Sequence, residues 1–171
     1  MQIRTLVLLA TVFCALPLPS HAQATTDKHF VWNVVKPPEV SIDHVETRFI
    51  GVQAATSEPR IRGSIIVRCS SNKHVDVIAG LISNMAGNPD TRLEPHARVR
   101  FDNQPPYEET WKAGDSGDTL FADAPQAMVD RFKNARQLAI EFKPVKRTPL
   151  LPQFDMAAFA ALYHDTCEVW E

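Results

Sequence analysis

The sequence has no excess of basic residues, and this limits the partners it can bind. Lysine and arginine number 18 against 20 aspartates and glutamates, which gives a formal net charge of −2 at pH 7. Proteins that bind nucleic acid through its phosphates carry a basic patch or a basic net charge. We therefore expect no nucleic-acid partner.

Glycine is also scarce, with 6 in 171 residues, and the sequence has no low-complexity tract and no internal repeat. Apolar residues make up 44% and charged residues 22%, a composition typical of globular proteins rather than of disordered or fibrous ones. A chain of this length supplies one full hydrophobic core and not two of ordinary size. Large multidomain enzymes are therefore excluded.

Long apolar runs are absent except near the N-terminus. Arg4 precedes an apolar run over residues 6–16, two prolines follow within residues 17–19, and small residues come next, up to Ala22. This order is typical of a secretory signal peptide, and the run is shorter than the roughly 20 residues that span a membrane. We predict a signal peptide over residues 1–22, with cleavage after Ala22 or, as the alternative, after Ala24.

The predicted leader sets the compartment and the domain boundaries. Export through such a signal leads to the periplasm, and no later segment approaches membrane-spanning length, so we expect no membrane insertion after cleavage. Residues 23–30 are polar, and we expect a flexible segment there. Residues 31–171 are predicted to form a single domain.

Only three cysteines are present, and Cys14 would leave with the signal peptide. Cys69 and Cys167 remain, and in an oxidising compartment two such cysteines most simply form a disulfide. The alternative is a pair of unpaired buried thiols. Closing a loop of about 100 residues stabilises a fold by about 4.7 kcal/mol in the chain-entropy model.

Alternation of apolar and polar residues predicts β-strands over most of the domain. Within 63–70, Ile65, Val67 and Cys69 share one face, so Cys69 is expected to point into the core. Within 97–102, alternate residues are charged, as in an antiparallel sheet with one wet face. The predicted strands cover residues 31–35, 45–56, 63–70, 74–83, 97–102, 107–112 and 138–143.

Two helices are predicted in the C-terminal half. Asp123 as N-cap and Pro125 in the first turn indicate a short helix to about residue 135. Asp155 is the expected N-cap of a last helix, on which an apolar stripe follows α-helical spacing; its members are Met156, Ala160, Tyr163 and Cys167. The fold class is α+β: a mainly antiparallel β-sheet or sandwich with two short helices and one disulfide.

No residues form a recognisable catalytic or metal site, and we expect no enzymatic activity, no metal and no cofactor. Residues 114–117 read Gly-Asp-Ser-Gly, as around the nucleophile of trypsin-like proteases, but the chain is too short for that two-barrel fold, and a polar turn explains the segment. Asp115, Asp118 and Asp123 lack the spacing of an EF-hand calcium loop. The histidines after the leader do not have metal-ligand spacing; they are His29, His44, His74, His96 and His164.

One surface is a candidate partner-binding face, because arginine and tryptophan are enriched where proteins dock. Its residues are Arg68, Arg98, Arg100, Asp102 and Trp111. The alternative is a cross-strand ion-pair face of little energetic content.

Several short motifs occur in a characteristic order. They are Trp32, Ser41-Ile42-Asp43, Ile65-Ile66-Val67-Arg68-Cys69, Val99-Arg100-Phe101-Asp102, Trp111, Leu120-Phe121, Met128-Val129, Leu138-Ala139-Ile140-Glu141-Phe142 and Phe154-Asp155 before a helix that ends at Cys167. Over about residues 30–168 the sequence resembles the periplasmic type VI secretion-associated family called TagO or VasI. It departs from that family after Phe154-Asp155, where Met156-Ala157-Ala158 stands in place of the usual glycine.

The resemblance implies an accessory protein of a contractile secretion machine in a Gram-negative bacterium, with no catalytic residues to carry over. The expected partner is another cell-envelope protein. The alternative function is a periplasmic immunity protein or inhibitor that caps a toxin or a hydrolase.

Overall fold

The computed structural model describes residues 33–35, 45–58, 60–83 and 92–169. The predicted signal peptide, both predicted cleavage sites, the expected flexible segment 23–30, Trp32 and residues 41–43 lie outside the described residues. Within the described part, no helix has the length and apolar character to cross a membrane.

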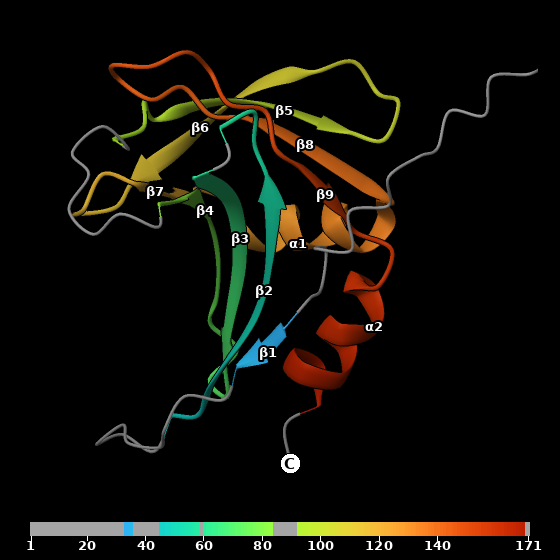
Figure 1. Ribbon diagram of the computed structural model, residues 1–171. Helices are drawn as coiled ribbons and strands as arrows, with labels where there is room; N and C mark the ends of the chain where they lie inside the picture. The colour runs from blue at the N-terminus through green and yellow to red at the C-terminus, as the bar shows by residue number, and fades with distance from the viewer. Residues whose placement is uncertain (1–32, 36–44, 59, 84–91, 170–171) are drawn as a thin grey trace, which may run out of the picture.

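Nine strands of the described residues form one antiparallel sheet in the order β1-β2-β3-β4-β7-β6-β5-β8-β9, shown in Figure 1. The strands are β1 (Asn33–Val35), β2 (Thr47–Ala55), β3 (Ile61–Ser70), β4 (Val75–Ser83), β5 (His96–Phe101), β6 (Tyr107–Ala113), β7 (Thr119–Ala122), β8 (Gln137–Glu141) and β9 (Gln153–Asp155). The helices are α1 (Pro125–Asn134) and α2 (Phe159–Tyr163), and α2 continues into a π-helical turn, His164–Glu168. The predicted α+β class with late helices is confirmed.

The sheet curls until its two ends approach each other, so that it resembles a nearly closed barrel rather than two separate layers (Figure 1). Gly63 in β3 shows how close they come. A Cβ atom at this position would lie 2.4 Å from Cγ of Pro152, just before β9, and 3.2 Å from Cζ of Phe154 within β9. The last strand therefore packs over a strand near the start of the sheet.

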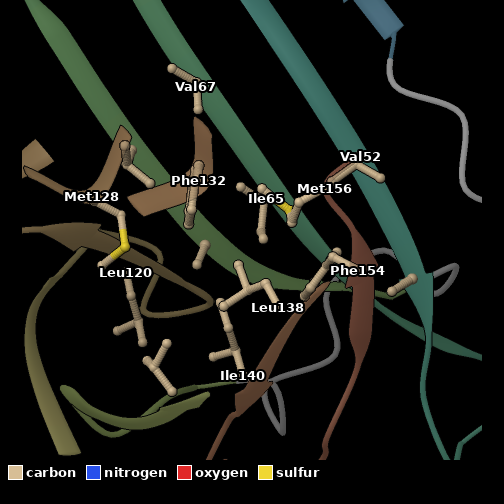
Figure 2. Close-up of a cluster of buried hydrophobic side chains, with 14 of the residues drawn as sticks. Val52, Ile65, Val67, Leu120, Met128, Phe132, Leu138, Ile140, Phe154 and Met156 are labelled. Carbon is tan, nitrogen blue, oxygen red and sulfur yellow. The ribbon is translucent and has the colours of Figure 1, made fainter. Parts of the chain in front are cut away.

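The core fills the concave side of the curled sheet, where α1 and α2 contribute their apolar faces (Figure 2). Phe132 of α1 lies between two aromatic rings. Its ring centroid is 6.1 Å from that of Phe101 and 5.4 Å from that of Phe159, the latter in an edge-to-face arrangement. As the alternation predicted, Ile65 and Val67 are fully buried in this core.

The predicted helix caps are wrong in detail. Ala124, not Asp123, occupies the N-cap of α1, and no side chain caps that helix. The Asp123 carboxylate instead lies 3.4 Å from Nζ of Lys112 on the neighbouring strand β6. Asp155 belongs to the unpredicted strand β9, and its carboxylate accepts a hydrogen bond from the backbone N–H of Ala157 (2.9 Å).

The predicted stripe of the last helix is correct only in part. Met156, Tyr163 and Cys167 are buried, but Ala160 is exposed and Phe159 is buried instead. The reason is that α2 begins only at Phe159. A stripe counted at α-helical spacing from Met156 therefore starts outside the helix.

Candidate functional site

Residues 166–169, the last that the structure describes, are attached to the sheet at two adjacent points. Cys69 of β3 and Cys167 of the π-helical turn form a disulfide with a Cα–Cα distance of 5.7 Å, which confirms the predicted bond. Arg48 of β2 is the cross-strand neighbour of Cys69. Its Nη1 donates hydrogen bonds to the carbonyl oxygens of Thr166 and Val169, each at 3.1 Å. Sequence reasoning missed Arg48 because its acceptors are backbone atoms more than 100 residues away.

The five residues of the predicted partner-binding face do not form one surface. Arg68 lies on β3, whereas Arg98 and Arg100 lie on β5, and strands β4, β7 and β6 separate them. Asp102 follows β5 with a positive φ of 48°, and one of its carboxylate oxygens accepts the backbone N–H groups of Arg136 and Gln137, each at 2.9 Å. Asp102 therefore fixes the start of β8.

The prediction that Trp111 belongs to an exposed face is wrong, because the residue is only 2% exposed. In β6, alternate residues from Tyr107 to Trp111 face the concave side of the sheet, and Lys112 faces out. The indole Nε1 and the Oε2 of Glu109 are buried and have no hydrogen-bond partner among the described residues. Trp111 is a core residue.

Glu109 lies in a partly buried polar cluster beside helix α1. Nη1 of Arg131 donates to the hydroxyl of Tyr107 (2.6 Å) and to Oε1 of Glu109 (3.4 Å). Burial raises the pKa of the Glu109 carboxyl, although the Arg131 charge and a hydrogen bond from Tyr107 act in the opposite direction. Burial is also the main cause that raises the pKa of Tyr107.

The outer face of strands β5, β6 and β8 carries a group of charged side chains, which we call the charged face. Its members are Arg98, Arg100, Glu108, Glu141 and Lys143. Arg98 lies 3.9 Å from both Glu108 and Glu141, and Nζ of Lys143 lies 3.5 Å from Glu108. Arg100 is exposed and lies opposite the small residue Ala139 in the β5–β8 register. No ion pair connects Arg100 to another described residue.

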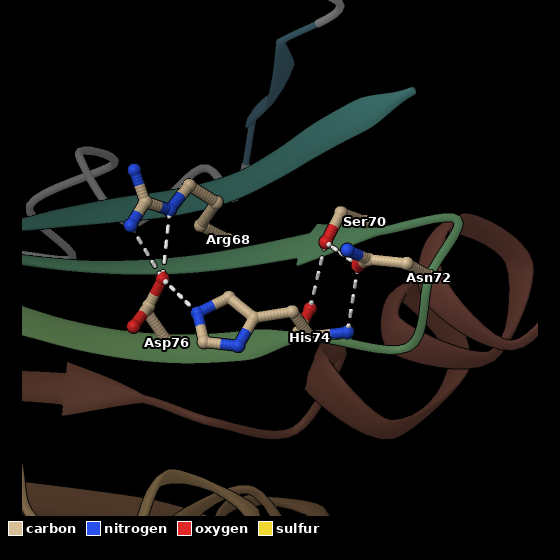
Figure 3. A network of polar contacts seen from close by, with 5 residues as sticks. All are labelled: Arg68, Ser70, Asn72, His74 and Asp76. Carbon is tan, nitrogen blue, oxygen red and sulfur yellow. Dashed lines mark hydrogen bonds and ion pairs between the residues drawn. The ribbon is translucent and has the colours of Figure 1, made fainter. Parts of the chain in front are cut away.

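Arg68 takes part in a different network, at the β3–β4 hairpin (Figure 3). One carboxylate oxygen of Asp76 accepts a hydrogen bond from Nε of Arg68 (2.8 Å) and lies 3.2 Å from Nε2 of His74. The Asp76 side chain is 18% exposed, against 41% for that of Arg68. Nearby, Oγ of Ser70 donates to Oδ1 of Asn72, which also accepts the N–H of His74. The network stabilises the hairpin and fixes Asp76.

A cleft of about 700 Å³ lies beside this hairpin. Its walls come from the start of β4, the end of β6, the β6–β7 turn and the start of α1, and its residues include His74, Asp76, Lys112, Asp115, Ser116, Phe121 and Asp123. The Ser116 hydroxyl donates to the Asp118 carboxylate, and no hydrogen bond joins it to a histidine among the described residues. The Gly-Asp-Ser-Gly segment thus forms part of a turn that is closed by this hydrogen bond between Ser116 and Asp118.

The structure does not gather the other sequence candidates into a metal site. Among the described residues, no group of three histidine, cysteine, aspartate or glutamate side chains could hold a metal ion. His29 and His44 lie outside the described residues.

No family model, no curated protein and no solved structure matches the chain.

Proposed function

We propose that the protein is an exported, non-catalytic accessory protein that binds another protein of the cell envelope. We further propose that it belongs with the type VI secretion-associated proteins of the TagO or VasI kind that its sequence resembles. The disulfide between Cys69 and Cys167 supports export, because stable structural disulfides form in oxidising compartments such as the periplasm.

The observation that carries binding is the exposed Arg100 on the charged face. Its neighbour Arg98 is flanked by two carboxylates, whereas Arg100 has no ion pair among the described residues. An arginine offers a planar set of donors that suits a carboxylate on a partner. The outer surface of three antiparallel strands presents it to solvent.

The test is affinity capture from the periplasm of the native host, with the tagged protein and two charge-reversal variants. Arg100→Glu changes the charged face, and Arg60→Glu makes the same change at an exposed position in the β2–β3 turn. We expect the wild type and Arg60→Glu to recover a secretion component, and Arg100→Glu to recover several-fold less, because charges across an interface govern association.

Two results would contradict the proposal. Equal recovery of the partner with the wild type and both variants would show that the charged face does not take part in binding. Recovery of a toxin or a hydrolase in place of a secretion component, with protection of cells on co-expression, would favour the immunity or inhibitor function instead.

A further inference from the structure

The outer face of the sheet, which is expected to be polar, carries an apolar row. Ile66, Ile78 and Phe121 are successive register partners across β3, β4 and β7, and Lys112 of β6 follows in the same row. The three apolar side chains are all partly exposed. Solvent-facing sides of antiparallel sheets are usually polar, so this row is a feature to explain.

The cleft lies at the Phe121 end of the row. Phe121 contributes a partly exposed aromatic ring from β7. His74 and Asp76 stand on one side, where β4 begins, and the β6–β7 turn with Asp115 stands on another. The cleft thus combines an aromatic surface with a wall on either side. Ile78, the register partner of Phe121, lies next to Phe121 in the apolar row.

The charged residues around Phe121 are mainly acidic. Asp76, Asp115 and Asp123 supply three carboxylates, and Lys112 supplies one ammonium group. Asp76 is held by Arg68, whereas no hydrogen bond or ion pair engages the exposed Asp115 carboxylate within the described residues. Lys112 is 75% exposed and 3.4 Å from Asp123, so it can move aside into solvent at little cost.

We propose that this cleft is a docking site for a basic side chain, an arginine, on an extended segment of a partner protein. The guanidinium plane stacks on the Phe121 ring while its N–H groups reach the Asp115 carboxylate. Apolar residues that flank the arginine in the partner segment pack against Ile78 and Ile66. This second surface adjoins the charged face at strand β6, which contributes Lys112 to the cleft and Glu108 to the charged face. The inference does not depend on the proposed function.

The test is a titration of the isotope-labelled protein, expressed from the full chain, with three acetylated and amidated tripeptides followed by NMR. The peptides are Leu-Arg-Leu, Leu-citrulline-Leu, which keeps the shape without the charge, and Leu-Glu-Leu. We expect Leu-Arg-Leu alone to shift the backbone signals of residues 112–121. Its affinity should fall as salt is raised, because the Debye length shortens from about 30 Å at 0.01 M to about 8 Å at 0.15 M.

Three variants locate the contact. We expect Asp115→Asn to weaken Leu-Arg-Leu binding about two- to fivefold, the range of an exposed ion pair. Phe121→Leu keeps an apolar surface but removes the ring, and should weaken binding by a similar factor. Asp165→Asn removes one exposed carboxylate from the C-terminal π-helical turn and should leave the affinity unchanged.

The proposal is wrong if Leu-citrulline-Leu or Leu-Glu-Leu binds as tightly as Leu-Arg-Leu, or if none of the three binds at the cleft. It is also wrong if the signals of residues 112–121 shift with protein concentration alone, which would indicate a second copy of the chain as occupant. Because Asp115 is exposed in a turn, its substitution tests the contact even if Phe121→Leu reduces stability.

Discussion

Arg48 donates a hydrogen bond to the backbone carbonyl of Thr166. The residue after Thr166 is Cys167, and its disulfide partner Cys69 is the cross-strand neighbour of Arg48. The two adjacent strands β2 and β3 therefore hold the same turn, one through a charged side chain and the other through sulfur. Both attachments lie on the concave side of the sheet, where α2 and the π-helical turn complete the core.

We predict that Arg48→Ala destabilises the protein by about 1.5–3 kcal/mol, the range for hydrogen bonds to a charged donor. The Arg48 side chain is only 23% exposed, so water replaces its contacts poorly. Urea unfolding measures the loss. Arg60→Ala, at an exposed turn position, is the control, and an equal effect of the two substitutions would contradict the anchoring role of Arg48.

Replacing both cysteines by alanine should lower the free energy of unfolding by up to about 4.7 kcal/mol, since the bond closes a loop of 98 residues. The same denaturation measured with a reducing agent provides an internal control. A reductant should lower the midpoint of the wild type and leave that of the double variant unchanged. A wild type insensitive to complete reduction would show that the bond contributes nothing.

Gly63→Ala is expected to destabilise the fold by about 1–3 kcal/mol through overpacking, because the new methyl group would meet the ring of Pro152 at 2.4 Å. Gly51→Ala is the matched control on the adjacent strand. There the nearest atom to a new Cβ is the carbonyl oxygen of Ile65 at 3.7 Å, an ordinary contact. Thermal unfolding that ranks the two variants equally would argue against close packing between β3 and β9.

Glu109→Gln should change how stability depends on pH. Burial raises the pKa of the Glu109 carboxyl in the folded state, so the folded protein binds more protons than the unfolded chain between the two pKa values. The contribution of Glu109 to stability is therefore present below its unfolded pKa and is lost as pH rises through the folded pKa. Glu109→Gln should remove this loss.

Thermal unfolding across the mildly acidic range checks the Glu109 prediction. Glu108→Gln makes the same substitution on the outer side of the same strand. If Glu109→Gln and Glu108→Gln changed the pH profile alike, burial of Glu109 would not be the cause.

Glu168 should affect the pH dependence of stability in the opposite direction to Glu109. A hydrogen bond from Lys133, and then one from His164, lower the pKa of the Glu168 carboxyl in the folded state. Its contribution is present above the unfolded pKa and is lost as pH falls through the lower folded pKa. Glu168→Gln should therefore reduce the loss of stability on acidification. An acid limb of the wild-type profile that Glu168→Gln leaves unaltered would refute this.

The fold class and the disulfide could be predicted from the sequence because long strands show a clear alternation of apolar and polar residues. In β3, the five residues from Ile65 to Cys69 alternate between buried and partly exposed and place Cys69 inside. Tyr163 and Cys167 are four residues apart on a helical segment, so both fall on its buried side. Strands β7 and β9, with 4 and 3 residues, are too short to show a period of two and were not predicted.

The candidate sites were less predictable, for reasons that lie in tertiary contacts. Glu109 occupies an inward position of β6 between Tyr107 and Trp111, so polarity alone could not tell which side of the strand Trp111 faces. The cleft depends on the pairing of β4 with β7, some 40 residues apart along the chain. Arg68 and Arg98 each occupy an outward position in an alternating strand, so the sequence suggested that they share a face. The strand order instead separates them by three strands.

Within the described residues, the two outermost strands of the sheet, β1 and β9, each comprise three residues. Unpaired strand edges can act as templates on which further molecules add, and short edges are one way in which natural sheets avoid this. At the β9 end of the sheet, three residues offer too few backbone partners to start such growth. We therefore expect the β9 edge of the folded protein to resist edge-to-edge polymerisation even at high protein concentration.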